Sequence, residues 1–274
     1  LILYIQYPIR CVPNCVGADL RSTELSNLNL SETDFLEANL ISSNLSGTNL
    51  SGSDFSGARM AAANLQDTNL ANTRFTGADL RGVDLRNANL RGADFTGARL
   101  DRVDMTDNDL TETLLHGAIL DEAVLVRVNL ANAELRGVSM INATMTSADL
   151  SDANLVGAIM SGSDISGAML DGADLSGAWL NLVDLSNSSL QDTTLRGAYL
   201  IGSRLPSTNL RSTSMEGAVL LGVNLGGKNQ LVTGVRYEHH VMFGADQNPV
   251  DIPFGGLSLG FVWRALENVE IRPE

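Results

Sequence analysis

Large apolar residues recur at every fifth position through most of the chain. From Leu20 to Leu225 all 42 such positions are apolar, and they comprise 31 Leu, 6 Met, 4 Phe and 1 Ile. The residue two positions before each of these centres is Ala, Ser, Thr or Val, except where Leu28 and Asn108 stand instead. So regular an internal period predicts a repeat architecture in which each unit packs on its neighbours.

A period of five fits neither a continuous helix nor a continuous strand. Successive centres on an α-helix would be rotated by about 140° and would share no face, and residues five apart on one strand point to opposite faces. The chain must therefore bend within every unit. The centre and the small residue point inward, the residue between them, most often Asp or Asn, points outward, and the next two residues form a corner. Glycine is concentrated at the second corner position, because it tolerates the backbone angles of tight turns.

The spacing of the aromatic centres predicts how many units complete one turn of the chain. These centres are 20 residues apart, at Phe35, Phe55, Phe75 and Phe95. Units of five in a coil of 20 give four sides to each coil. The same spacing predicts a ladder of stacked outward side chains at Asn29, Asn49, Asn69 and Asn89.

The unit, shown plainly in GADLRGVDLRNANLRGADF (77–95), resembles the consensus of the pentapeptide-repeat family. The resemblance covers residues 16–227 and implies an all-β fold, a right-handed quadrilateral β-helix or β-solenoid of about 10 coils. Residues 1–15 and 228–274 break the pattern, so we expect an N-terminal cap or irregular coil and a C-terminal capping segment. The stretch 257–268 is a candidate short helix. The piece VRYEHHVMFGADQNP resembles the terminal segment of cyanobacterial members, which favours a bacterial source.

The N-terminal segment carries the two cysteines, Cys11 and Cys15. We expect free thiols, with a local disulfide as the alternative in an oxidising compartment. The chain starts at Leu1, so a processed or truncated start is open. The expected location is the cytoplasm, and the alternative is export to a periplasm or thylakoid lumen.

Composition and motifs argue against catalysis and against direct nucleic-acid binding. The formal net charge is −14, whereas phosphate binding needs a basic surface. No apolar run reaches the ~20 residues of a membrane span. There is no nucleophile elbow, P-loop, C-x-x-C or dinucleotide fingerprint. His239 and His240 beside Glu238 are adjacent residues that seldom converge on one metal. We therefore expect no enzyme, no cofactor and no metal, and a non-enzymatic protein–protein interaction scaffold with an unknown protein partner.

Acidic residues are concentrated in the middle of the repeats. Residues 101–192 carry 15 acids and 3 bases, and residues 16–100 carry 10 acids and 7 bases. The family resemblance implies an alternative function, a DNA mimic that binds DNA gyrase or another type II topoisomerase. The candidate acidic DNA-mimic surface comprises Asp104, Asp109, Glu112, Asp121, Asp149, Asp152, Asp164 and Asp184. The corner residues Arg81, Arg86 and Arg91 are expected to be solvated and paired with Asp79, Asp84 and Asp94.

Apolar residues also form an outward stripe in the second half of the repeats. One register contains Ile119, Ile159, Trp179, Tyr199 and Val219, interrupted by Ser139, and Ile141 flanks it. The candidate protein interface comprises Ile159, Trp179, Leu182, Tyr199, Ile201, Val219 and Leu221. Trp and Tyr are typical interface anchors. The C-terminal tail, a second copy of the chain in a homodimer, or another protein are the three candidate occupants.

Overall fold

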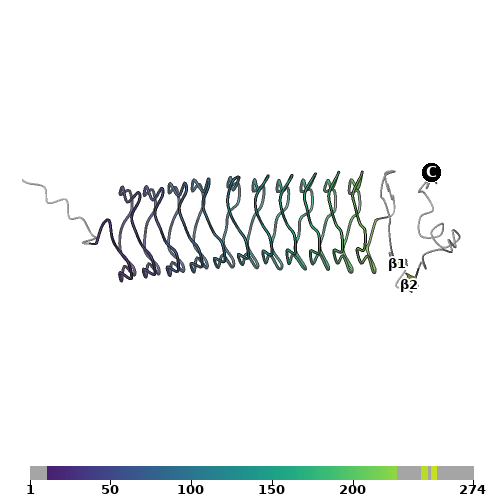
Figure 1. Cartoon of the computed structure of the whole chain (residues 1–274), viewed down its shortest axis with the longest axis horizontal. Coiled ribbons are helices and arrows are strands. Elements are labelled where there is room, and N and C mark those ends of the chain that lie inside the picture. Colours follow the sequence, from purple (N-terminus) through teal and green to yellow (C-terminus); the bar gives the residue numbers. More distant parts are fainter. Residues whose placement is uncertain (1–10, 227–241, 246–247, 252–274) are drawn as a thin grey trace, which may run out of the picture.

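The computed structural model describes residues 11–226, 242–245 and 248–251. Residues 11–226 form a rod of stacked coils (Figure 1). Further along the chain, strand β1 (Met242–Ala245) pairs antiparallel with strand β2 (Asn248–Asp251). These described residues contain no helix, in agreement with the all-β prediction.

Neighbouring coils pair through residues that are 20 positions apart. The outward residue of a unit forms a parallel bridge to its counterpart one coil later, as Asn29 does with Asn49 and Trp179 does with Tyr199. Each coil therefore contains four pentapeptides, one on each side of the rod.

The four sides are named here in chain order by residues that mark them. The phenylalanine side has Phe35, Phe55, Phe75 and Phe95 among its centres. The aromatic face carries the outward residues Ile159, Trp179, Tyr199 and Val219. The aspartate face carries the outward residues Asp84, Asp104, Asp164 and Asp184, and the asparagine face carries Asn29, Asn49, Asn69 and Asn89.

Backbone hydrogen bonds hold each side to the same side of the next coil. The N–H of the centre Leu40 donates to the carbonyl of Arg59 at 2.7 Å, and the N–H of Arg59 donates back to the carbonyl of Ala38 at 2.9 Å. Because the bonds run between coils, the energy of each coil depends on its two neighbours, as in other solenoids.

Every corner has the same backbone conformation. In most units the N–H of the residue after the corner donates to the carbonyl of the centre, as Ser43 does to Leu40 at 3.0 Å. The second corner residue has a positive φ in every unit from Gly17 to Gly222. A type II turn demands this conformation at its third residue, and glycine adopts it without steric cost. The predicted concentration of glycine at this position therefore has a conformational cause.

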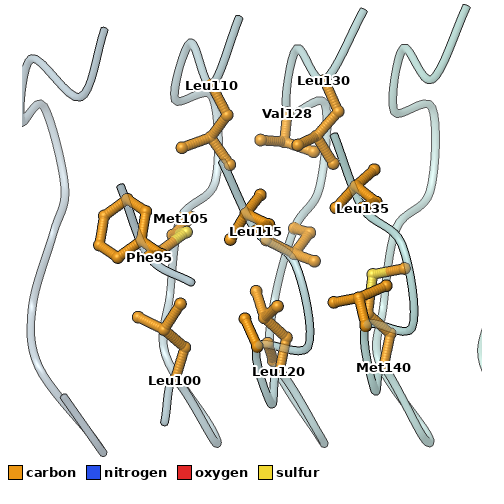
Figure 2. Close-up of a cluster of buried hydrophobic side chains, with 14 of the residues drawn as sticks. Phe95, Leu100, Met105, Leu110, Leu115, Leu120, Val128, Leu130, Leu135 and Met140 are labelled. Atoms are coloured by element: carbon orange, nitrogen blue, oxygen red, sulfur yellow. The ribbon is translucent and has the colours of Figure 1, made fainter. Parts of the chain in front are cut away.

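The core is a continuous column of side chains along the axis of the rod. Leu, Met and Phe centres from successive coils stack on one another inside the coils (Figure 2), and most have no exposed surface. The four phenylalanines form a parallel stack with ring centroids 4.6 to 5.3 Å apart. Of the two exceptions at the small position, Leu28 is partly buried and Asn108 is buried.

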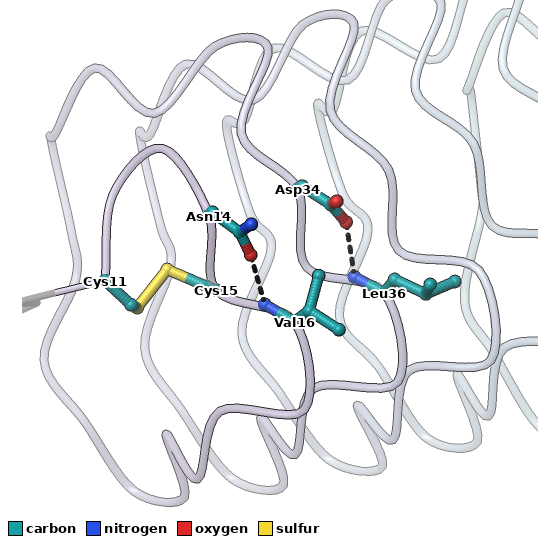
Figure 3. The surroundings of a disulfide bond; sticks show 6 residues. All are labelled: Cys11, Asn14, Cys15, Val16, Asp34 and Leu36. Atoms are coloured by element: carbon teal, nitrogen blue, oxygen red, sulfur yellow. Dashed lines mark hydrogen bonds between the residues drawn. A yellow bond between two sulfur atoms is a disulfide. The ribbon is translucent and has the colours of Figure 1, made fainter.

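Every outward Asp and Asn between residues 14 and 224 stabilises its own corner. Its Oδ1 accepts the N–H of the residue two positions later, as Asn14 does from Val16 at 3.3 Å and Asp34 from Leu36 at 3.0 Å (Figure 3). This local bond is the reason why these residue types recur between the small residue and the centre.

The asparagine ladder is confirmed. The Nδ2 groups of Asn49, Asn69 and Asn89 each donate to the Oδ1 of the asparagine one coil earlier, at 2.9 to 3.0 Å.

The first coil contains a disulfide between Cys11 and Cys15 (Figure 3), so the prediction of free thiols is wrong. Cys15 occupies a centre position and is buried. The bond closes the first corner, where the N–H of Asn14 also donates to the carbonyl of Cys11 at 2.7 Å. Two thiols brought this close by one turn oxidise readily wherever the compartment permits.

Several predicted terminal features lie outside the described residues. These are the first ten residues of the N-terminal cap, the candidate helix at 257–268, and His239 and His240. Of the C-terminal capping segment, 228–274, the described residues are those of β1 and β2.

The disulfide generates a stability prediction. Replacing both Cys11 and Cys15 by Ser should lower the free energy of unfolding by about 2 kcal/mol, the value expected for opening so short a loop. Denaturant unfolding of the oxidised protein and of the variant measures the difference. Adding a reductant should lower the stability of the native protein by the same amount and leave the variant unchanged. Equal stability with and without reductant would contradict the bond.

Candidate interaction surfaces

The aromatic face brings the predicted apolar stripe together in one column. Parallel bridges link Ile159 to Trp179, Trp179 to Tyr199, and Tyr199 to Val219. The Trp179 and Tyr199 rings lie against each other, with centroids 5.1 Å apart and planes tilted by 32°. The coil spacing therefore fixes these two rings as one rigid aromatic unit.

This column is exposed and uncharged. Trp179 is 50% exposed, and Ile159, Tyr199 and Ile201 are each 38% exposed, whereas Val219 and Leu221 are half-buried. Between Ile119 and Val219 the outward column holds no ionisable group except the Tyr199 hydroxyl. Ser139, which interrupts it, donates its hydroxyl to Asp121 at 2.6 Å. A contiguous apolar patch of this kind marks an interaction site more often than ordinary surface does.

Leu182 lies at the corner that follows the aromatic face and is 70% exposed. It has a φ of 59°, which is unfavourable for a bulky side chain. A Cβ at position 202 would lie 2.8 Å from the Leu182 Cδ2, so Gly202 leaves the room that this side chain needs. Neither conformational preference nor burial explains a leucine here.

At the corner that precedes the aromatic face, the second residue is glycine in nine successive coils, a feature that the sequence-based predictions did not include. These residues are Gly57, Gly77, Gly97, Gly117, Gly137, Gly157, Gly177, Gly197 and Gly217. For most of them an added Cβ would meet nothing within 4 Å. The other three corners mix glycine with Asn, Asp, Ser, Glu, Ala, Arg or Leu at the same φ. Neither packing nor φ therefore explains why the second position of this one corner is glycine over so many coils.

Exposed apolar residues outside the predicted stripe were also missed, among them Met169. Met169 is 47% exposed on the asparagine face, where it forms bridges with Asp149 and Ser189. Its position in the five-residue register was visible in the sequence, but it has no apolar neighbour in its own column.

The candidate acidic residues gather mainly on two adjacent sides of the rod. The aspartate face carries Asp104, Asp164 and Asp184. The asparagine face carries Asp109 and Asp149, and the corner after it carries Glu112 and Asp152. Asp121 lies at the corner between the aromatic and aspartate faces.

Many of these carboxylates already have partners within the rod. Glu112 pairs with Arg91 through two hydrogen bonds of 3.0 and 3.1 Å, and Asp121 accepts the N–H of Ile141 at 3.0 Å. Asp184 lies 3.6 Å from Arg204. The outward aspartates among them also accept the N–H of their own corner, as Asp164 does from Ser166.

The expected arginine pairs are right in two cases and wrong in one. Arg81 pairs with Asp79 and Arg86 with Asp84, each at 2.7 Å. Arg91 reaches across to Glu112 in the next coil instead of pairing with Asp94. The Asp94 carboxylate instead accepts bonds from Thr96 and Thr76.

The arginine pairs lower the pKa of their carboxyl partners. Hydrogen bonds from the Arg81 side chain hold the pKa of Asp79 below its usual value, and Arg86 does the same to the pKa of Asp84. For Asp184, partial burial raises the pKa, but the hydrogen bonds from Ser186 outweigh it and the pKa is lowered. These carboxyl groups are therefore ionised at neutral pH.

The described residues offer no metal site and no membrane span. Within 11–226 and the two short strands, no group of three or more His, Cys, Asp or Glu side chains converges. The same part of the chain has no helix long and apolar enough to cross a membrane.

The geometry defines the class of the protein as a β-solenoid built from five-residue units, with its distinctive side chains on flat outer surfaces. The family model of pentapeptide repeats (8 copies) matches residues 14–52, 38–77, 53–92, 68–107, 109–146, 148–187 and 188–227. The chain belongs to the pentapeptide repeat family.

Solved structures of other pentapeptide repeat proteins are similar to this chain. HetL, involved in heterocyst differentiation regulation in the cyanobacterium Nostoc sp. strain PCC 7120, is 26% identical over 77% of this chain and 86% of its own, with a TM-score of 0.37. Full-length QnrB1, a plasmid-mediated fluoroquinolone resistance protein, is 16% identical over 82% and 93%, with a TM-score of 0.45. A protein of the Arabidopsis thaliana thylakoid lumen is 25% identical over 44% and 70%, with a TM-score of 0.23. No match is found among the curated proteins.

The arginine pairs predict how stability depends on pH. The fold lowers the pKa of Asp79 and Asp84. The stabilisation that their ionised forms give to the folded state is therefore complete above the carboxyl pKa of the unfolded chain, about 4. It is lost as the pH falls through the lower pKa values of the folded state. The midpoint temperature of thermal unfolding should therefore decrease as the pH is lowered from about 4 to about 2.

The double variant Asp79→Asn with Asp84→Asn isolates this effect. Asparagine keeps the bond to the corner N–H, as it does elsewhere in the rod, but it does not titrate. The midpoint temperature of this double variant should decrease less steeply than that of the native protein over the same pH range. An identical slope in both proteins would contradict the assignment.

Proposed function

We propose that this chain is a non-enzymatic interaction scaffold and that a protein partner binds its aromatic face. The observation that supports this proposal is the uncharged column around Trp179 and Tyr199, which lies beside a corner whose second residue is always glycine in these coils. The repeats supply a rigid rod, and the outward positions supply the recognition surface.

The physical properties of the column suit protein binding. The two touching rings offer a large apolar area, and their contact restricts their rotamers, so binding orders few side chains. Leu182 is unfavourable for folding, because it combines a left-handed corner with high exposure. The glycine at the second position of the corner leaves that part of the backbone beside the rings without a side chain.

The dimensions of the column indicate the chemistry of the partner. Ile119 and Val219 are five coils apart, about 24 Å at the spacing of paired strands. A helix of about 16 residues has this length and a diameter of about 10 Å. The column itself carries no charge to pair, and the Arg196 and Glu216 side chains at the adjoining corner pair with each other. We therefore assign the partner as a protein that presents the apolar face of a helix.

A photo-crosslinking experiment tests the interface. A photoreactive amino acid replaces Tyr199 in the full chain, and the matched control carries it at Ser189 on the opposite, asparagine face. Irradiation in lysate of the source cells should yield one discrete adduct from position 199 and none from position 189. The adduct should disappear with Leu182→Gly, because that variant removes the exposed apolar corner.

The identity of the adduct and the stability of the variant decide the outcome. A crosslinked peptide from another protein that forms an apolar helix face supports the proposal. A second copy of this chain or its own residues 228–274 would identify the occupant as a homodimer contact or the C-terminal tail, and would overturn it. The Leu182→Gly rod should melt at the same or a higher temperature, because glycine relieves the left-handed corner. A lower melting temperature would show that Leu182 serves folding.

A DNA mimic that binds a type II topoisomerase is the second candidate function. The observation that favours it is the gathering of acidic residues on the aspartate and asparagine faces, with Asp164 and Asp184 one coil apart. Their bonds to corner N–H groups are the competing explanation, because the fold itself uses these carboxylates.

A gyrase supercoiling assay at two salt concentrations tests the mimic. Inhibition should weaken as salt rises, since the contact would be electrostatic. The variant Asp164→Asn with Asp184→Asn keeps the corner bonds and should reduce inhibition several-fold. The Trp179→Ser and Tyr199→Ser double variant is the control and should inhibit as the native chain does. Absence of inhibition at micromolar protein would exclude gyrase mimicry.

The disulfide supports an oxidising compartment as the site of action. Such bonds persist in secreted, periplasmic or lumenal proteins and are rare in the cytosol. We therefore favour the exported location over the cytoplasmic one that the sequence analysis expected.

A further inference from the structure

The series of bridges between coils has one interruption. From Asn14 to Asn224, each outward residue in the described rod is bridged to the residue 20 positions later, except that Asn89 is not bridged to Asp109. Figure 1 shows the same place as a wider space between two coils on one side of the rod. We call this contact, between residues 84–92 and 104–112, the seam.

Backbone hydrogen bonds are missing along the seam. In the preceding coil the N–H groups of Leu65, Asp67, Leu70 and Asn72 all donate to carbonyls one coil later, at 2.8 to 3.0 Å. At the seam the equivalent N–H groups make no such bond; these are Leu85, Asn87, Leu90 and Gly92. The returning bonds from the N–H groups of Asp104 and Asp109 are also missing.

Asn108 lies at the small interior position beside the seam and is only 5% exposed. Its Nδ2 donates to the carbonyls of Leu85 and Ala88, at 3.1 and 3.2 Å. Its buried Oδ1 has no partner. The asparagine side chain extends one atom further from the backbone than the Ala, Ser, Thr or Val found at the other such positions except Leu28, so it holds the two coils apart.

The outward side chains at the seam do not close it. Asn89 donates its amide to Asn69, but Asp109 has no donor to offer the Oδ1 of Asn89, so the ladder ends there. The ion pair between Arg91 and Glu112 spans the seam, but both side chains are more than 60% exposed, and such pairs contribute little.

The other two sides of the same coils are closed. On the aromatic face the N–H of Leu80 donates to Arg99 at 2.8 Å. On the phenylalanine side the N–H of Phe95 donates to Leu114 at 2.8 Å. The coils are therefore unbridged on the asparagine face and weakly joined on the aspartate face, where Asp84 stays bridged to Asp104 but the bonds from the Leu85 and Asp104 N–H groups are missing. The other two sides are held, which is the geometry of a hinge.

We propose that the seam is a hydrated hinge, in which water bridges the unpaired backbone groups and the Asn108 Oδ1, and the rod bends about its closed sides. Buried polar groups without a protein partner are normally satisfied by ordered water. The seam has several such groups facing one another across an opening. This inference goes beyond the proposed interface and does not depend on it.

Hydrogen exchange of the full-length oxidised protein tests the hydration. The amides of Leu85, Asn87, Leu90 and Gly92 should exchange about tenfold or more faster than those of Leu65, Asp67, Leu70 and Asn72. The two sets occupy the same positions in consecutive coils, so they are matched in exposure and in local turn geometry. Equal protection of the two sets would overturn the proposal.

Two substitutions should close the seam. Thr48 donates its hydroxyl to the carbonyl of Leu25 at 2.7 Å, the same 23-residue relation that joins Asn108 to Leu85. Asn108→Thr therefore keeps this bond with a shorter side chain, and Asp109→Asn supplies the amide that the ladder lacks. Together they should restore the slow exchange of the preceding coil. Unchanged fast exchange in the folded double variant would overturn the role of Asn108.

The reverse substitution guards against a variant that fails to fold. Thr48→Asn places the same amide in an intact part of the rod and should accelerate exchange between residues 24–32 and 44–52. Native protection there would again overturn the assigned cause.

Spin-label distances test the bending. Labels at cysteines replacing Asn72 and Asp152 lie on one corner, four coils apart across the seam, at about 19 Å. Labels replacing Asn132 and Ser212 are also four coils apart on that corner, but they do not span the seam. The first pair should give the broader distance distribution, and the double variant should narrow it. Equal widths for the two pairs in the native chain would overturn the hinge.

Discussion

The backbone hydrogen bonds between successive coils are the constraint on which the rest of this rod depends. They form only if each coil returns to the same place after 20 residues, and this return requires the same left-handed corner in every unit. The small residue, the centre and the second corner residue are therefore restricted at every repeat. The outward residue is restricted less, because Asp and Asn favour the corner but Trp179 and Tyr199 occupy the same position in well-paired coils.

A surface residue can therefore indicate function only where the fold gives no structural reason for its presence. An outward Asp has a structural reason to be present, since it accepts the N–H of its own corner. An outward Trp has none, and neither does a leucine at a left-handed corner. The nine-coil glycine column is informative for a related reason: the conformation favours glycine at all four corners equally, so conformation alone does not explain a column confined to one corner.

Much of the architecture can be predicted from the sequence, because each local preference recurs along the chain and so also determines which residues meet in neighbouring coils. The five-residue period, the corner glycines and the 20-residue phenylalanine spacing together predict the pairing of Asn29 with Asn49 and of Trp179 with Tyr199. The partner of Arg91 was wrong because the prediction looked along the chain, whereas Glu112 reaches it from the next coil. The disulfide was missed because its formation depends on how the first corner brings Cys11 to Cys15, and on redox conditions that composition does not reveal.

At the seam, one interior residue interrupts the backbone pairing between coils that otherwise continues along the rod. Asn108 was visible as an exception in the sequence, but its effect depends on the carbonyls of Leu85 and Ala88 in the coil before it. The seam also lies close to the boundary between residues 16–100, with 10 acids and 7 bases, and residues 101–192, with 15 acids and 3 bases. The exposed rings of the aromatic face lie entirely on its C-terminal side. A rod with an unbroken ladder resists bending equally along its length, whereas a rod with one weak contact bends there first. A hinge at this position would turn the acidic and aromatic part of the surface as one rigid body relative to the N-terminal coils.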